Sequence, residues 1–205
     1  MTDDAALFDA WLGGDRDAGA ELIERYYDAI VRFFRTKVGD SGDVAADLVQ
    51  RTFLGLAESG GRFRGTSSFR AFLYGVARNI FLEHLRTLTR DRLRDPDFAV
   101  SSVVDLRTGV ATRAARAEER RLLVDCLQQL PVELQVAVEL HYWEDVSVGE
   151  LAEIQGVPPG TVKSRLFRAR GLLREALAAA EAAPAEKAAV GALLDAWPAV
   201  EPDAG

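Results

Sequence analysis

Apolar residues recur at three- and four-residue intervals through the first half of the chain, which is the spacing of one face of an α-helix. One run starts at Leu22 and is interrupted at Gly39, a second covers residues 44–57, and a third begins near residues 66–68. The positions expected in the core are Ile23, Tyr27, Ile30, Phe34, Ala45, Leu48, Val49, Thr52, Leu56, Phe69, Leu73, Val76, Ala77 and Ile80. The pattern predicts three or four helices that end near Arg86.

The helical pattern disappears after Arg86 and returns at Glu118. The stretch between them mixes both charges, contains Pro96 and Gly109, and has no sustained apolar stripe, so we expect a linker with little fixed structure. Alternation of apolar and polar residues, which marks β-strands, is almost absent. The predicted fold class is all-α, with two small helical domains at 5–86 and 118–177, a flexible linker at 87–117 and a C-terminal extension at 178–205.

The C-terminal extension is rich in alanine, proline and acidic residues. Four of its apolar residues nevertheless fall at helical spacing on one face, namely Val190, Leu193, Leu194 and Trp197. Two interpretations stay open: a solvated tail, or a short helix that contacts the body of the protein or a partner.

Charge changes this picture, because the chain has a formal net charge of -7 and an acidic balance argues against non-specific nucleic-acid binding. The segment "VPPGTVKSRLFRAR", residues 157–170, nevertheless carries four basic side chains and no acid. Since most of the acid lies away from this segment, the local charge is positive there.

Composition excludes several classes of site. Cys126 is the only cysteine, so no internal disulfide forms, and we expect it to be a small core residue. The two histidines, His84 and His141, add too few ligands for a zinc site, and no nucleophile–base set or glycine-rich phosphate loop is present. We therefore expect no cofactor and no enzyme activity. The start "MTDDAALF" has no cationic leader, and no stretch approaches the roughly 20 apolar residues of a membrane helix, so we expect a soluble cytoplasmic protein.

Residues 147–170 have the local signals of a helix-turn-helix. Ser147 and Glu150 have capping-box spacing, Gly156 suits a left-handed helix end, and Pro159 suits the first position of the next helix. On that second helix the predicted inward stripe is Val162, Leu166, Ala169 and Leu173, which places Lys163, Ser164, Phe167 and Arg168 on the exposed side.

The exposed side suits the major groove of duplex DNA. Lys and Arg donate to guanine acceptors there, and an apolar side chain contacts a thymine methyl group. Flanking phosphate contacts are expected from Arg165, Arg170 and Arg174. The alternative is the exposed basic face of a structural helix.

The segment "RFRGTSSFRAFLYGVARNIFLEHLR", residues 62–86, interleaves basic and aromatic side chains. This combination is typical of single-stranded DNA binding, in which cations neutralise the backbone and rings hold unstacked bases. Phe72, Asn79, Glu83 and Arg86 lie beside the core stripe and form the candidate base-reading edge. The alternative is that the rings belong to the core, which we accept for Phe69 and leave open for Phe72.

Three segments in this order resemble a known family: "DVAADLVQRTFLGLA", "FRGTSSFRAFLYGVARN" and "LPVELQVAVELHYWEDVSVGELAEIQGVPPGTVKSRLFRARGLLRE". They are similar to the second and fourth conserved regions of extracytoplasmic-function sigma factors, the small two-domain members of the bacterial sigma-70 family. The resemblance covers about residues 5–177 without the linker, and it implies a promoter-specificity subunit that binds core RNA polymerase, recognises two promoter elements and helps to open the duplex.

The resemblance also assigns roles by position. The upstream (minus-35) element would contact Thr161, Lys163, Ser164, Arg165, Phe167, Arg168 and Arg170. The unpaired downstream (minus-10) element, with a base flipped into a pocket, would meet Arg62, Arg64, Phe72, Arg78, Asn79 and Arg86. The clamp helices of the largest polymerase subunit would bind an outward stripe of Asp43, Asp47, Gln50 and Leu54, for which a solvated acidic face is the alternative. The fourth region would also contact the polymerase flap, and an anti-sigma factor is a further expected partner.

The chain departs from the family pattern at several positions. Arg51 and Ala57 replace an acid and a tryptophan, His141 replaces an arginine, and Pro158 replaces a serine cap. The extension is not part of the minimal family pattern, and one hypothesis is that it regulates DNA binding by lying over the cationic helix. The alternative function is a helix-turn-helix regulator that acts on duplex DNA without polymerase.

Overall fold

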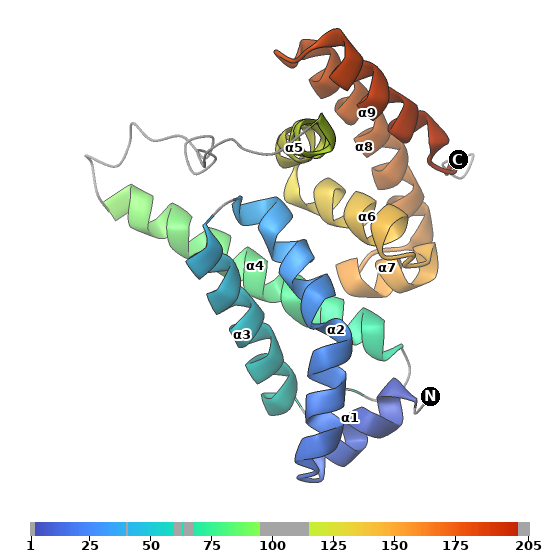
Figure 1. Cartoon of the computed structure of the whole chain (residues 1–205). Helices are drawn as coiled ribbons and strands as arrows, with labels where there is room; N and C mark the ends of the chain where they lie inside the picture. Colours follow the sequence, from blue (N-terminus) through green and yellow to red (C-terminus); the bar gives the residue numbers. More distant parts are fainter. Residues whose placement is uncertain (1–2, 40, 60–62, 64–67, 95–114, 201–205) are drawn as a thin grey trace. The chain divides into compact units, whose positions relative to one another are not determined.

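The computed structural model describes residues 3–39, 41–59, 63, 68–94 and 115–200 (Figure 1). Within these ranges all regular structure is α-helical and there is no strand, which confirms the predicted all-α class. The chain divides into two compact units, at residues 1–109 and 110–205.

The first unit contains α1 (Asp4–Leu12), α2 (Arg16–Val38), α3 (Gly42–Glu58) and α4 (Phe69–Arg94). The α2 helix begins where the Asp15 side chain accepts hydrogen bonds from the backbone N–H groups of the first turn, and it ends at Gly39, whose φ is 64°. Consecutive helices pack on one another, so that the predicted apolar stripes form a common core. Its fully buried side chains include Leu22, Ile30, Phe34, Leu48, Leu56, Leu73 and Ala77.

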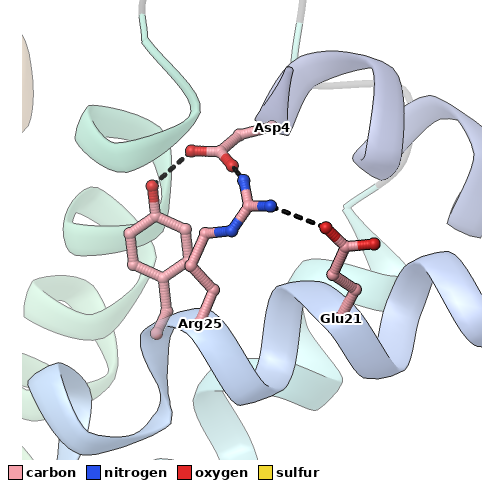
Figure 2. A network of polar contacts seen from close by, with 4 residues as sticks. Asp4, Glu21 and Arg25 are labelled. Atoms are coloured by element: carbon pink, nitrogen blue, oxygen red, sulfur yellow. Dashed lines mark hydrogen bonds and ion pairs between the residues drawn. The ribbon is translucent and has the colours of Figure 1, made fainter. Parts of the chain in front are cut away.

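The α1 helix is attached to α2 by a polar network. The Asp4 carboxylate accepts hydrogen bonds from the Arg25 guanidinium and the Tyr26 hydroxyl, and Arg25 also binds Glu21 at 2.7 Å (Figure 2). Burial, together with the bond to Asp4, raises the pKa of the Tyr26 hydroxyl, so this group remains a donor. On α1 itself, Phe8 is completely buried.

The second unit contains α5 (Ala115–Gln128), α6 (Val132–Trp143), α7 (Val148–Gln155), α8 (Pro159–Ala179) and α9 (Pro184–Ala196). The α8 helix packs against α5, α6 and α7, and α9 lies on α5 and α8 (Figure 1). Cys126 is buried on α5, where burial raises the pKa of its thiol, which agrees with the predicted core role.

Two predicted helix boundaries and the predicted core position Tyr27 were wrong. Tyr27 is 48% exposed, because the buried face of α2 runs through Leu22, Ile30 and Phe34. The α4 helix continues to Arg94 instead of ending near Arg86, because residues 87–94 contain no glycine or proline and Leu88 continues the partly buried stripe. The α5 helix begins at Ala115, before the expected Glu118. Leu193 is 44% exposed, since it lies beside the stripe of α9 that faces the unit. Most of the predicted linker, residues 95–114, lies outside the described residues.

Candidate nucleic-acid interface

The helix-turn-helix has the predicted local geometry. The backbone N–H of Glu150 donates to Ser147 Oγ at 3.2 Å, and the backbone N–H of Ser147 donates to Glu150 Oε2 at 3.0 Å, which completes the capping box. Gly156 ends α7 in the left-handed conformation, with φ 64° and ψ 39°. Pro159 occupies the first turn of α8. These local signals fix the turn between α7 and α8.

The α8 helix has one buried and one exposed face in its first three turns. The four predicted inward residues, Val162, Leu166, Ala169 and Leu173, are all 0% exposed. On the other side, Thr161, Ser164 and Arg168 are exposed and Lys163 is partly exposed. Phe167 is 60% exposed. An aromatic ring that stays in water forgoes the favourable free energy of burying its apolar surface. An exposed phenylalanine among cations is therefore typical of a contact surface.

Arg165 is turned toward the body of the second unit. Its guanidinium donates to Oε1 of Gln155, and it lies 3.8 Å from a carboxylate oxygen of Glu133. Gln155 itself donates to the Glu133 carbonyl at 2.8 Å, so the three side chains join α6, α7 and α8. A phosphate contact by Arg165 would have to add to these bonds or exchange with them.

Arg170 and Arg174 are also engaged, in this case with the C-terminal extension. The Arg170 guanidinium donates to the Pro198 carbonyl at 3.0 Å and to the Leu194 carbonyl at 3.4 Å. Arg174 forms an ion pair with Asp195 at 2.8 Å. Of the predicted cations on α8, these two therefore face α9, whereas Lys163 and Arg168 lie on the outward face.

The candidate base-reading edge of α4 contains both half-buried and exposed side chains. Phe72 is partly buried, with ring centroids 5.2 Å from Phe63 and 5.9 Å from Phe8. Asn79 and Arg86 are exposed, and Arg78 is partly exposed with a guanidinium nitrogen 3.4 Å from Asn79 Oδ1. The predicted contacts Arg62 and Arg64 lie outside the described residues. The Phe72 ring is thus held from one side by other aromatic rings.

The outward stripe of α3 has the predicted exposure. Its members Asp43, Asp47, Gln50 and Leu54 are exposed, and Leu54, an apolar side chain, is 53% exposed. Arg51 approaches Asp47 at 4.0 Å and Glu83 of α4 at 3.2 Å, so the residue that departs from the family pattern links α3 to α4.

Arg51 also affects His84 on α4. Partial burial lowers the pKa of the His84 imidazole most, and the positive charge of Arg51 lowers it further. The negative charge of Asp47 opposes this shift. The imidazole is therefore neutral near pH 7, and it stacks on Phe81 at a centroid distance of 6.5 Å.

The α1 helix also contributes to this site, which was not predicted from the sequence. Phe8 lies at centroid distances of 5.1 Å from Phe69 and 5.6 Å from Phe63, so α1 supports the rings at the start of α4. The sequence pattern that could have predicted α1 is the helical spacing of Leu7, Phe8 and Trp11 before the paired glycines 13 and 14. This run is too short to be separated from chance spacing.

Over the described residues, no group of three or more His, Cys, Asp or Glu side chains is placed to hold a metal ion. Within the same ranges, no helix is both long and apolar enough to cross a membrane.

Family models match both units. Residues 22–91 match the model described as sigma-70 region 2, and residues 120–173 match the model described as sigma-70, region 4. The first match contains α3 and the candidate base-reading edge of α4, and the second contains the helix-turn-helix. The α1 and α9 helices lie outside both matches.

Curated relatives are similar along most of the chain. The RNA polymerase sigma-H factor of Pseudomonas aeruginosa is 32% identical over 172 residues, which cover 80% of this chain and 88% of that protein. The ECF RNA polymerase sigma-E factor of Haemophilus influenzae is 30% identical over 178 residues, which cover 83% of this chain and 93% of that protein.

Solved structures are also similar. The sigma factor RpoE of Bartonella quintana, determined in complex with the anti-sigma factor NepR, has a TM-score of 0.64 and 26% identity, and covers 78% of this chain and 96% of its own. CnrH, determined in complex with the cytosolic domain of CnrY, has a TM-score of 0.62 and 25% identity, and covers 86% of this chain and 97% of its own.

Proposed function

Because the chain belongs to the extracytoplasmic-function branch of the sigma-70 family, and is therefore an RNA polymerase sigma factor that confers promoter recognition for transcription initiation, we propose specific roles for its exposed surfaces. The alternative of a helix-turn-helix regulator that acts without polymerase is not favoured, because the match to sigma-70 region 2 and the curated relatives both point to polymerase subunits.

The outward face of α8 reads the upstream promoter element. This assignment rests on one observation: Phe167 is 60% exposed among Thr161, Lys163, Ser164 and Arg168, on a helix whose opposite face is fully buried. Lys163 and Arg168 supply donors for guanine edges or phosphates, and Phe167 supplies an apolar surface for a thymine methyl. Arg165 and Arg170 contribute from the sides of this face where their internal bonds permit.

The edge of α4 captures the unpaired strand of the downstream element. Asn79 supplies hydrogen bonds to base edges, and the cations Arg62, Arg64, Arg78 and Arg86 neutralise the backbone. Phe72, held by Phe63 and Phe8, provides a rigid wall for an extruded base. Extrusion costs a few kcal/mol of stacking, so a preformed pocket shifts the duplex toward opening.

The exposed stripe on α3, made of Asp43, Asp47, Gln50 and Leu54, binds the clamp helices of the largest polymerase subunit. Support comes from the combination of an exposed leucine with two exposed carboxylates on one face of α3. The second unit additionally contacts the polymerase flap, and the protein acts in the cytoplasm, where polymerase is present.

An anti-sigma factor is a further proposed partner. Support comes from the similar structures, one of which is a sigma factor in complex with the anti-sigma factor NepR. The partner of this chain is expected to cover surfaces that promoter DNA or polymerase would otherwise use.

The upstream assignment is tested by charge reversal on α8. Lys163→Glu and Arg168→Glu are expected to weaken binding of the reconstituted holoenzyme to promoter duplex. Each is also expected to reduce the slope of log affinity against log salt concentration by about one, because one counterion fewer is released on binding for each phosphate contact that is lost. The matched control is Arg120→Glu, which makes the same charge change at an exposed position of α5.

Fluorescence anisotropy with core polymerase measures both partners in the same assay. Normal promoter binding by both α8 variants would overturn the assignment of the upstream element to α8. An equal loss in Arg120→Glu would show that the overall charge and not the α8 face determines binding. Polymerase affinity should remain unchanged in all three.

A further inference from the structure

The α9 helix is held on the second unit by few buried groups. Between residues 184 and 200, the buried side chains are Val190, Leu194 and Trp197. The helix is joined to α8 through residues 180–183, and the backbone is extended at both ends of this connection. The buried leucines Leu127, Leu140, Leu151, Leu166 and Leu173 of the second unit lie on α5, α6, α7 and α8. An element with so few buried apolar contacts opens at a lower free energy than the core does.

The surface under α9 has a defined chemistry. Tyr142 of α6 presents its ring to Trp197, with centroids 4.3 Å apart and planes 8° apart, and its hydroxyl donates to the Pro198 carbonyl at 3.2 Å. Leu177 of α8 lies 3.8 Å from the position of a Cβ on Gly191. We define Tyr142, Arg170, Arg174 and Leu177 as the α9 cradle.

The cradle selects a helix with a particular pattern. Tyr142 accepts a flat aromatic ring, Leu177 accepts a small or aliphatic residue, and Arg170 binds backbone carbonyls that a helix end leaves without partners. Arg174 binds a carboxylate one residue after the second apolar position, as Asp195 follows Leu194. This ion pair is exposed and adds little to the stability of the contact. It therefore contributes to specificity for an acidic partner more than to affinity.

We propose that the α9 cradle is a docking site for an amphipathic, acidic helix of another protein, and that α9 is an internal occupant which such a helix displaces. A partner helix would carry apolar residues at the spacing of Val190, Leu194 and Trp197 and an acid at the place of Asp195. Displacement would release Arg170 and Arg174 from their contacts with the extension.

A labelled peptide with the sequence of residues 184–200 serves as the probe, and the full-length chain serves as the receptor. Binding requires the fraction of molecules in which α9 has opened, so the apparent affinity rises as that fraction rises. Trp197→Ala removes the ring that stacks on Tyr142 and is expected to increase peptide affinity at least tenfold. Gly191→Ala is expected to decrease it by up to about fivefold, because alanine favours the helix and its Cβ meets Leu177 at ordinary contact distance. Leu193→Ala, at an exposed position of the same helix, is the control and should match the wild type.

Equal peptide affinity in all four proteins, or binding by none of them, would overturn the proposal. Light scattering after gel filtration detects a dimer in which two copies of the chain exchange α9. Formation of such a dimer without binding of the peptide would also overturn the proposal. Hydrogen exchange of the wild-type chain gives an independent test that needs no variant to fold. Amides of α9 should exchange faster than those of the middle of α8, and equal exchange would mean that α9 is a fixed part of the core.

Discussion

Phe8 is expected to carry a large share of the stability of the first unit. Its side chain is 0% exposed, and it meets the rings of Trp11, Phe63, Phe69 and Phe72 at centroid distances of 5.1 to 6.0 Å. Truncation of a buried phenylalanine to alanine costs about 3–5 kcal/mol. Since a domain of this size is stable by about 5–15 kcal/mol in total, Phe8→Ala should lower its melting temperature by roughly 15 °C or more.

Indole N–H signals in NMR spectra recorded during heating measure this effect for each unit. The chain has 3 tryptophans, of which Trp11 belongs to the first unit while Trp143 and Trp197 belong to the second. In Phe8→Ala the Trp11 signal should disappear at a lower temperature, while the other two keep the wild-type temperature. Phe8→Leu, which keeps most of the volume, should recover most of the loss.

Tyr27→Ala is the control, because this ring is 48% exposed and its removal should change stability by no more than about 0.5 kcal/mol. If the Trp11 signal of Phe8→Ala melted with that of the control, α1 would not support the aromatic cluster. The proposed rigid wall at Phe72 would then lose its physical basis.

Three further changes test other parts of the structure. Gly19→Ala would place a Cβ 2.6 Å from the Trp11 indole ring, so despite the gain in helix propensity we expect a net loss of about 1–2 kcal/mol and a shifted Trp11 indole signal; an unshifted signal would exclude the close approach of α1 to α2. Ser147→Ala removes the capping box and should destabilise the second unit by about 1 kcal/mol in thermal unfolding, whereas Ser164→Ala on the exposed face of α8 should cost less. His84→Gln tests the lowered pKa of this imidazole: because the unfolded chain binds the proton more readily, the wild-type first unit should lose stability as the pH falls through about 6.5, and the variant should lack that part of the loss. Identical melting curves against pH for the two proteins would contradict the depressed pKa.

Local signals in the sequence predicted the helix-turn-helix well. A capping box, a left-handed glycine and a proline in the first turn are each determined by a few neighbouring residues, and the buried stripe of α8 follows from its 3.6-residue period. Ser147, Gly156 and Phe167 therefore have the predicted geometry and exposure.

Contacts between distant segments could not be predicted in this way. The spacing of Arg165 and Arg170 suggested phosphate contacts, but their bonds to Gln155 and to the Pro198 carbonyl depend on how α7 and the extension pack on α8. The exposure of Leu193 likewise depends on which side of α9 meets the unit. For the extension, the choice between a solvated tail and a docking helix required the partner ring of Tyr142, which lies 55 residues earlier than Trp197 and has no local signal.

The most direct test of the central claim is run-off transcription with core RNA polymerase on a library of genomic fragments, with the purified chain added or left out. The account predicts that defined start sites appear only when the chain is present, and that Lys163→Glu or Arg168→Glu weakens these starts while Arg120→Glu preserves them. If the distribution of start sites were the same with and without the chain, this would contradict the claim that the chain directs polymerase to promoters.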